Sequence, residues 1–238
     1  MAAETQKLVD TEKKVVYKFY SNVAETDVKK VDVSTLNWAK HTLTLSAAST
    51  ENFKVGEVIT TAATEHFLVT GFTAGASTVE VVGWDNTNKT ATTILTTMSN
   101  GDAIVGGVSG THTETVSNSG NLTELDYNVL VTKIQWMTNG ENVKIEWDGS
   151  STEAVVASIG GNGVLNLPYQ EFPGIGSNAT GDTGGVLGDI QFSTVGFGSG
   201  DDYTIIMECK KQAPGYDIPQ YELNAGLGFT VDFVLGNR

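Results

Sequence analysis

Hydrophobic and polar residues alternate along several short stretches of the chain. Val143, Ile145 and Trp147 are separated by polar residues, and a second alternating run precedes them. A period of two places every second side chain on one face of a β-strand. An Asn-Gly pair at 139–140 lies between the two runs and accepts the positive φ angles of a tight type I′ turn. Residues 129–148 are therefore predicted to form a β-hairpin.

Similar runs recur along most of the chain, and helical periodicity is absent apart from a weak signal in the first dozen residues. Glycines and Asn-Gly or Asp-Gly pairs separate the runs, which is typical of turns between strands. Many short strands at close spacing predict an all-β protein. Strands are expected at residues 15–20, 28–33, 66–70, 78–84, 91–96, 189–194, 203–210 and 229–235.

Two stretches lack a strand pattern and are predicted to be loops. Residues 160–188 and residues 211–223 each hold two of the four prolines. Long loops in compact domains usually carry function or contact a neighbour. The second loop precedes renewed alternation at Phe229, Val231 and Phe233. This C-terminal segment is predicted either to form an edge strand of its own domain or to add a strand to a neighbouring subunit.

Residues 39–112 have the character of a separate module. They contain several short runs with tight turns, among them Phe53-Lys-Val-Gly-Glu-Val-Ile-Thr, and polar segments rich in Gly, Ser and Thr border them. A segment of this length suffices for a small barrel with its own core. The chain is therefore predicted to fold as a discontinuous β-sandwich of residues 1–38 and 113–238 with an inserted small β-barrel module of residues 39–112.

Composition and charge exclude several classes of partner. The 238 residues hold 14 Lys and Arg against 28 Asp and Glu, a formal net charge of −14, and the one arginine is Arg238. Phosphate clamps and basic grooves for nucleic acid are therefore not expected. No apolar run approaches the roughly 20 residues that span a bilayer, so no membrane partner is expected.

The start of the chain and its single cysteine bear on where the protein is made. The first residues lack the apolar core of a signal peptide, and Cys209 alone permits no internal disulfide. Synthesis in the cytoplasm is therefore expected. Cys209 falls on the apolar face of the predicted strand 203–210, so it is predicted to be a buried small hydrophobe.

The chain offers little for catalysis or for metal binding. The three histidines have no partner at metal-ligand spacing, and no P-loop or Gly-x-Ser-x-Gly motif is present. No enzyme activity, cofactor or metal site is expected. Carboxylates are abundant, so counting alone excludes neither a glycosidase pair nor a calcium site, although acids at strand ends usually cap turns. The acids weighed for these roles are Glu146, Asp148, Asp182, Asp189, Asp201 and Asp202.

Four tryptophans bear on a sugar-binding alternative, because β-sandwiches often bind sugars through aromatic and amide groups. Trp136 and Trp147 fall in line with apolar residues, so both are predicted to pack in the core. Trp84 precedes the polar run Asp-Asn-Thr-Asn and is the better candidate for exposure. Trp38 is a further candidate.

Two segments carry more distinctive strand-and-turn motifs. They are residues 136–149, Trp-Met-Thr-Asn-Gly-Glu-Asn-Val-Lys-Ile-Glu-Trp-Asp-Gly, and residues 188–211, which begin Gly-Asp-Ile-Gln-Phe-Ser-Thr-Val. With them, roughly residues 13–37 and 122–211 resemble virion structural proteins of tailed bacteriophages, cyanophages in particular. The resemblance implies a non-catalytic capsid decoration or cement protein, located in the virion, that binds and stabilises the phage head shell.

That interpretation implies partners and an interface. The expected partners are the major capsid protein or other virion subunits, and the chain is expected to form a homo-oligomer. The interface candidates are Phe229, Val231, Phe233 and Trp84. A structural component of the tail or neck and a carbohydrate-binding adhesin module remain the alternatives.

Overall fold

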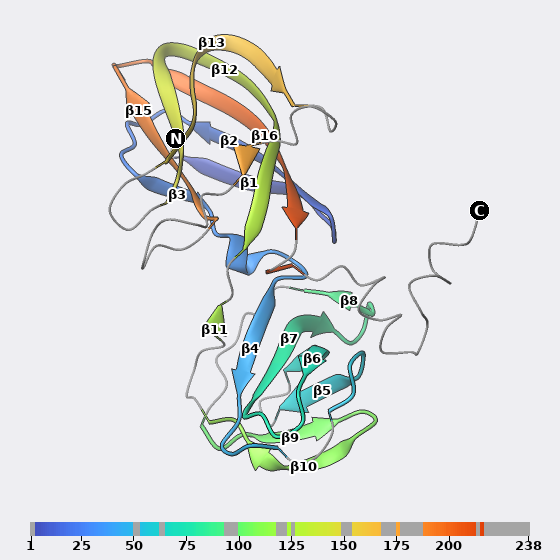
Figure 1. The fold of residues 1–238 in the computed structure, drawn as a ribbon. Coiled ribbons are helices and arrows are strands. Elements are labelled where there is room, and N and C mark those ends of the chain that lie inside the picture. Colours follow the sequence, from blue (N-terminus) through green and yellow to red (C-terminus); the bar gives the residue numbers. More distant parts are fainter. Residues whose placement is uncertain are drawn as a thin grey trace, which may run out of the picture. The chain divides into compact units, whose positions relative to one another are not determined.

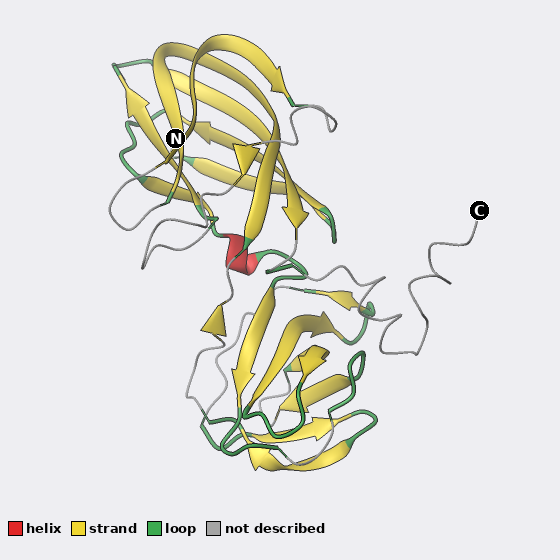
Figure 2. Cartoon of the chain, in the orientation of Figure 1, coloured by secondary structure: helices red, strands yellow, loops and turns green. Residues whose placement is uncertain are grey.

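The structure is a computed structural model. It describes residues 3–49, 53–61, 65–92, 100–117, 123–124, 127–148, 154–167, 175–176, 188–212 and 215–216. Within these residues the fold is all-β, with one short 3-10 helix at Val33–Thr35 (Figure 2). The chain divides into two compact units, here called unit 1 (Met1–Val33 with Asp126–Pro214) and unit 2 (Ser34–Leu125 with Gly215–Arg238). A β-sandwich with a small barrel-like module was the predicted fold class, and it is confirmed.

Unit 1 is an eight-stranded antiparallel sheet folded into a sandwich. The strand order is β1-β2-β16-β12-β15-β3, and β13 and β14 pair with the other side of β12 (Figure 1). The strands are β1 (Glu4–Asp10), β2 (Lys14–Ser21), β3 (Val28–Val31), β12 (Asn128–Trp147), β13 (Ala154–Asn166), β14 (Ile175–Gly176), β15 (Ile190–Val195) and β16 (Asp202–Gln212).

The two long strands β12 and β13 join the layers of the sandwich. Residues 128–139 of β12 pair with β16, and residues 142–147 pair with β15. Between these parts the pairing of β12 with β13 shifts register, and Gly140 and Gly161 have positive φ angles of 89° and 64°. Both strands therefore bend from one layer into the other at an irregularity that glycine permits.

The predicted hairpin over residues 129–148 is therefore wrong. The Asn-Gly pair makes a bulge inside one continuous strand, in which the Thr138 hydroxyl donates a hydrogen bond to the carbonyl of Glu141. Beyond the bulge the chain continues forward and gains β15 as a new partner. The predicted loop over residues 160–188 is likewise too long at its start, because residues 160–166 belong to β13.

The core of unit 1 lies between its layers. Phe19 of β2 and Phe192 of β15 come from different layers and meet edge to face, with ring centroids 4.8 Å apart. Trp147 is 4% exposed and Cys209 is fully buried, so both predictions of burial are confirmed. Burial also raises the pKa of the Cys209 thiol to about 12, with a smaller contribution from the charge of Glu208, so this thiol stays protonated.

The first strand was not predicted. The sequence showed only a weak helical signal there, whereas residues 4–10 form β1, an edge strand whose side chains are almost all exposed. Its backbone pairs with β2 over residues 15–20. Asp10 at its end forms an ion pair with the buried amine of Lys211 on β16, and burial lowers the pKa of that lysine. Backbone pairing and one buried ion pair, rather than an apolar face, hold this strand.

Unit 2 is a second antiparallel sheet, with the order β10-β9-β5-β6-β7-β4-β11 and β8 beside β7. An isolated bridge between Leu45 and Val116 links the end of β4 to the end of β10, so the sheet closes toward a barrel. The strands are β4 (Lys40–Thr44), β5 (Val58–Thr61), β6 (His66–Phe72), β7 (Thr78–Asp85), β8 (Thr90–Ala91), β9 (Ala103–Gly106), β10 (Gly110–Thr115) and β11 (Thr123–Glu124).

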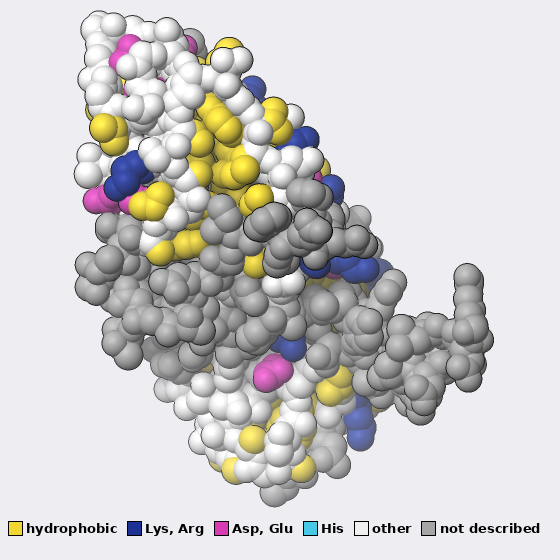
Figure 3. Space-filling view, turned by 45° about the horizontal axis from the view of Figure 1, so that its top comes forward, with side chains coloured by type: hydrophobic (Ala, Val, Ile, Leu, Met, Phe, Trp, Pro, Cys, Tyr) yellow, Lys and Arg dark blue, Asp and Glu magenta, His cyan; other side chains and the backbone are white. Residues whose placement is uncertain are grey.

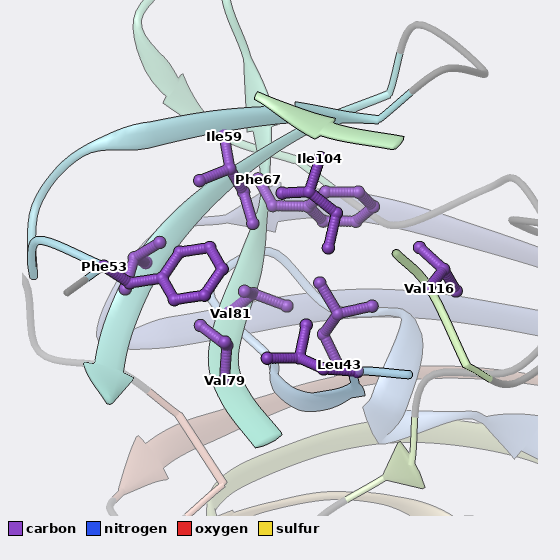
Figure 4. Packing of buried hydrophobic residues seen from close by; sticks show 10 residues of the cluster. Leu43, Phe53, Ile59, Phe67, Val79, Val81, Ile104 and Val116 are labelled. Atoms are coloured by element: carbon purple, nitrogen blue, oxygen red, sulfur yellow. The ribbon is translucent and has the colours of Figure 1, made fainter. Parts of the chain in front are cut away.

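Alternating apolar residues fill the interior of unit 2. Leu43, Phe53, Ile59, Phe67 and Val81 point toward one another in Figure 4 and are almost completely buried. The boundaries of the unit lie outside the predicted module of residues 39–112, because β11 pairs with β4 and Tyr216 pairs with Ala39. Residues 93–96 and 229–235, where strands were also predicted, lie outside the described residues.

Candidate binding groove

An open groove runs over the outer face of unit 1, across strands β13, β12 and β16. Its volume is about 410 Å³. Met137 and Val164, which lie on neighbouring strands, are 63% and 59% exposed. On the face of unit 1 seen in Figure 3, hydrophobic side chains gather in one strip, and the charged side chains in view lie beside the strip. The groove residues are Gln135, Trp136, Met137, Asn162, Gly163, Val164, Thr204 and Ile206.

The cross-strand register explains why these side chains meet. Gln135 pairs with Val164 on one side and with Ile206 on the other, and Met137 pairs in the same way with Asn162 and Thr204. Paired residues share a face of the sheet, so these side chains form adjacent rows. No residue of the groove carries a charge, which leaves amide and hydroxyl groups as its polar features.

Trp136 pairs with the fully buried Ile205, so its side chain lies on the core-facing side of β12, but it is half-buried and therefore less enclosed than predicted. Its cross-strand partner on β13 is Gly163, and a Cβ atom added at Gly163 would overlap the indole ring. The indole Nε1 donates a hydrogen bond of 3.2 Å to the carbonyl of Gly160. Because glycine offers no side chain, the ring covers the β13 backbone and stays half-buried.

The sequence carried one signal for the groove that alternation alone does not use. Ile205, Ile206 and Met207 are consecutive apolar residues, so one of them must face away from the core. Ile205 and Met207 are fully buried, and Ile206 is the outward residue that lines the groove. The same signal is present at the other two exposed apolar residues, because Met137 follows Trp136 and Val164 precedes Leu165.

A buried cluster of acids lies at the bend beside the groove. The Glu25 carboxylate pairs with the amine of Lys30 at 2.5 Å and accepts a 2.6 Å hydrogen bond from the hydroxyl of Tyr203. Burial and the hydrogen bond to Glu25 raise the pKa of Tyr203. Glu141, on the bulge, is 4% exposed, and neither of its carboxylate oxygens has a hydrogen-bond partner. Burial, followed by the charges of Asp201 and other acids, raises the pKa of Glu141 to about 7.

The acids considered for calcium or for a glycosidase pair have structural partners. Asp189 accepts a 2.8 Å hydrogen bond from the Val33 amide and pairs with Lys29 at 2.6 Å. Burial nonetheless raises the pKa of Asp189 to about 6, because it outweighs these partners. Asp201 caps its own turn by accepting a 2.6 Å hydrogen bond from the Gly198 amide.

Two of the remaining acids that the structure describes lie near lysines. Glu146 pairs with Lys144 at 2.6 Å, and Asp148 lies 3.7 Å from the amine of Lys29. Asp182 lies outside the described residues. In the part of the chain that the structure describes, no group of three His, Cys, Asp or Glu side chains is placed to hold a metal ion.

Unit 2 brings a glutamate, a serine and a histidine together, and the glutamate, Glu57, ends the Phe-x-Val-Gly-Glu motif of residues 53–57. The Ser109 hydroxyl lies 2.8 Å from Glu57 and 2.8 Å from Nε2 of His112, whose ring stacks on Phe53. The amides of Val108 and Ser109 also donate to Glu57. Burial raises the pKa of Glu57, but these hydrogen bonds and the Lys54 amide outweigh it and hold the pKa below its ordinary value.

This arrangement differs from a catalytic triad. In a triad the histidine accepts the serine proton and the acid orients the histidine. Here Ser109 lies between the other two groups and donates to Glu57, so Nε2 of His112 acts as the donor toward Ser109. The constellation therefore fixes the turn between β9 and β10.

Of the sequence-predicted interface residues, Trp84 lies within the described part of the chain. Trp84 on β7 is partly buried and meets Trp38 edge to face at 6.2 Å, and both pack with Leu68 and Val82. The indole nitrogen of Trp84 is enclosed and has no hydrogen-bond partner. Phe229, Val231 and Phe233 lie outside the described residues.

Comparisons with known proteins give no relative. No family model matches the chain, and neither a curated protein nor a solved structure matches it. Among the helices of the described residues, none is long and apolar enough to cross a membrane.

Proposed function

We propose that the chain is a non-catalytic structural protein of a virion, a capsid decoration or cement protein that binds and stabilises the phage head shell. The uncharged apolar groove on the outer face of unit 1 is the observation that carries this proposal. Buried centres of protein interfaces lack charges and favour aromatic residues and methionine, which are the properties of Trp136 and Met137. The partner is the major capsid protein or another virion subunit.

The resemblance to phage virion proteins supports the same face. Its two distinctive segments, residues 136–149 and 188–211, contribute to β12, β15 and β16, which are neighbours in the sheet. Residues of β12 and β16 line the groove. A stable contact on such a face buries about 1,200–2,000 Å² in total, and many copies on one shell add avidity.

Quantitative mass spectrometry of purified particles of the phage that encodes the chain tests the virion role. Copies in the hundreds indicate the shell, whereas a number that matches one ring indicates the neck or tail. Absence from particles would refute the proposal. Particles carrying Met137→Asp should lose the protein, because a charge in the groove would be buried without a partner. Leu8→Asp on the exposed strand β1 is the matched control and should leave occupancy unchanged.

A carbohydrate-binding function is the second candidate, and the position of Trp136 favours it. Trp136 is half-buried and borders the groove, and the groove amides of Gln135 and Asn162 offer a sugar hydrogen bonds. A glycan array with the purified protein tests this function. Binding that is lost in Trp136→Ala and retained in Trp84→Ala would favour an adhesin, and an array without signal would exclude it for the glycans presented.

A further inference from the structure

The edge strands of unit 1 differ in how they are protected against pairing. Within the described part of the chain, β1, β3, β13 and the two-residue β14 each pair with one neighbour only. A free strand edge offers unpaired amides and carbonyls, so proteins protect it with charges, prolines or short length. β1 carries Glu4, Lys7 and Asp10, and β3 consists of four residues of which two are lysines.

β13 has none of these protections. It spans thirteen residues, Ala154–Asn166, and contains no charged residue and no proline. Val155 is 54% exposed in the part before the bend, and Val164 is 59% exposed in the part after it. In a chain with 42 charged side chains, 14 basic and 28 acidic, an uncharged edge of this length stands out.

We propose that β13 is a self-association edge, which pairs antiparallel with β13 of a second copy of the chain across a two-fold axis. A two-fold axis places each residue of an edge strand opposite a residue of the identical strand, so the pairing is self-complementary. For β1 such a pairing would set Lys7 near Lys7 and Glu4 near Asp10, and opposed like charges are destabilising. Among the described edge strands of unit 1 that are longer than two residues, β13 is the one on which self-pairing opposes no like charges.

The net charge gives this interface a distinctive salt dependence. Each copy carries −14, so two copies repel each other at long range. Salt screens that repulsion but leaves backbone hydrogen bonds and apolar contacts at β13 intact. Self-association through β13 therefore strengthens as salt concentration rises, whereas an interface made of ion pairs weakens.

Sedimentation equilibrium of the full-length chain over a dilution series tests the proposal. The wild type should form a dimer that tightens with salt. Val155→Lys and Val164→Lys place a lysine in each straight part of β13, and at least one of them should weaken the dimer by about tenfold, because each substitution occurs twice across the axis. Both positions are more than half exposed, and circular dichroism should show unchanged folding.

Two controls separate this edge from other interfaces. Leu8→Lys makes the same kind of change on β1, where the side chain is 45% exposed, and should leave the dimer unchanged. Phe229→Asp with Phe233→Asp tests the C-terminal segment as the alternative occupant of the edge.

A monomeric wild type, a dimer that weakens with salt, or a dimer insensitive to both β13 lysines would overturn the proposal. Loss of the dimer in the Phe229 and Phe233 variant would also overturn it. Sedimentation measures free copies of the chain, whereas the virion role is tested by the composition of purified particles. A monomeric wild type would therefore leave the proposed virion role open.

Discussion

Replacing Glu141 by glutamine should stabilise the protein at neutral and alkaline pH. The carboxylate lies on the bulge of β12, is 4% exposed and has no hydrogen-bond partner on either oxygen. Burial raises its pKa from an ordinary value of 4.5 to about 7, and the charges of Asp201, Asp202 and Glu25 add to this. Ionised Glu141 is therefore a buried charge that faces other acids, which destabilises the folded chain.

The sign of the pH dependence follows from where the proton binds more tightly. The folded chain keeps the proton of Glu141 up to about pH 7, and the unfolded chain loses it near pH 4.5. Glu141 therefore costs nothing below about pH 4.5, and its cost grows until about pH 7 and stays constant above it. The two pKa values correspond to about 3 kcal/mol, and solvent near the exposed bend reduces this to about 1–2 kcal/mol.

Urea unfolding of wild type and Glu141→Gln, followed by tryptophan fluorescence over a series of pH values, measures this difference. The variant should be more stable by about 1–2 kcal/mol near pH 8 and equal to the wild type near pH 4. Glu146→Gln is the control, because Glu146 is equally buried but pairs with Lys144 at 2.6 Å, and this variant should be less stable. A Glu141→Gln protein that is destabilised near pH 8 would refute the reasoning.

Three further substitutions test packing. Trp147→Ala should lower the free energy of unfolding by about 3–5 kcal/mol, because it leaves a cavity in the core, and a loss below about 1 kcal/mol would place the indole outside it. Glu57→Ala should cost about 2–3 kcal/mol and speed amide exchange at Ser109, whereas unchanged exchange would show that the carboxylate does not hold this turn. Gly163→Val should cost about 1–3 kcal/mol by overlapping Trp136, and Trp136→Ala in the same chain should recover part of it; strictly additive losses would contradict the contact.

Alternation predicted the strands that bury one face against a core. β2, β7, β15 and β16 lie where apolar residues recur at every second position, and the buried residues Cys209 and Trp147 follow from the same pattern. The pattern reports burial on one side of a strand. It therefore gives no prediction for β1, which has no apolar face. Backbone pairing with β2 and the ion pair of Asp10 hold this strand.

Turn residues gave a correct local signal and a wrong global interpretation. Asn139-Gly140 predicts a positive φ angle, and Gly140 has one. Both a hairpin turn and a bulge require that angle, and only the partner strands distinguish them. Those partners, β13, β15 and β16, lie later in the chain, so the bend and the groove beside it depend on contacts that local sequence does not encode.

The discontinuity of unit 1 has a consequence for synthesis on the ribosome. β2 ends at Ser21 and its partner β16 begins at Asp202, so translation at 5–20 residues per second delays their pairing by roughly 10–40 s. The barrel strands β4 to β11 emerge within that interval and can fold first.

A folded barrel then shortens the remaining search. Thr42 pairs with Thr123 and His41 with Glu124, so the points where the chain enters and leaves unit 2 become neighbours. A loop of roughly ninety residues is thereby reduced to a short link, which lowers the entropic cost of joining the two parts of unit 1 by roughly 2–3 kcal/mol. Strands β4 to β11 can thus act as a folding clamp, because they can close before the last strands of the sandwich are made.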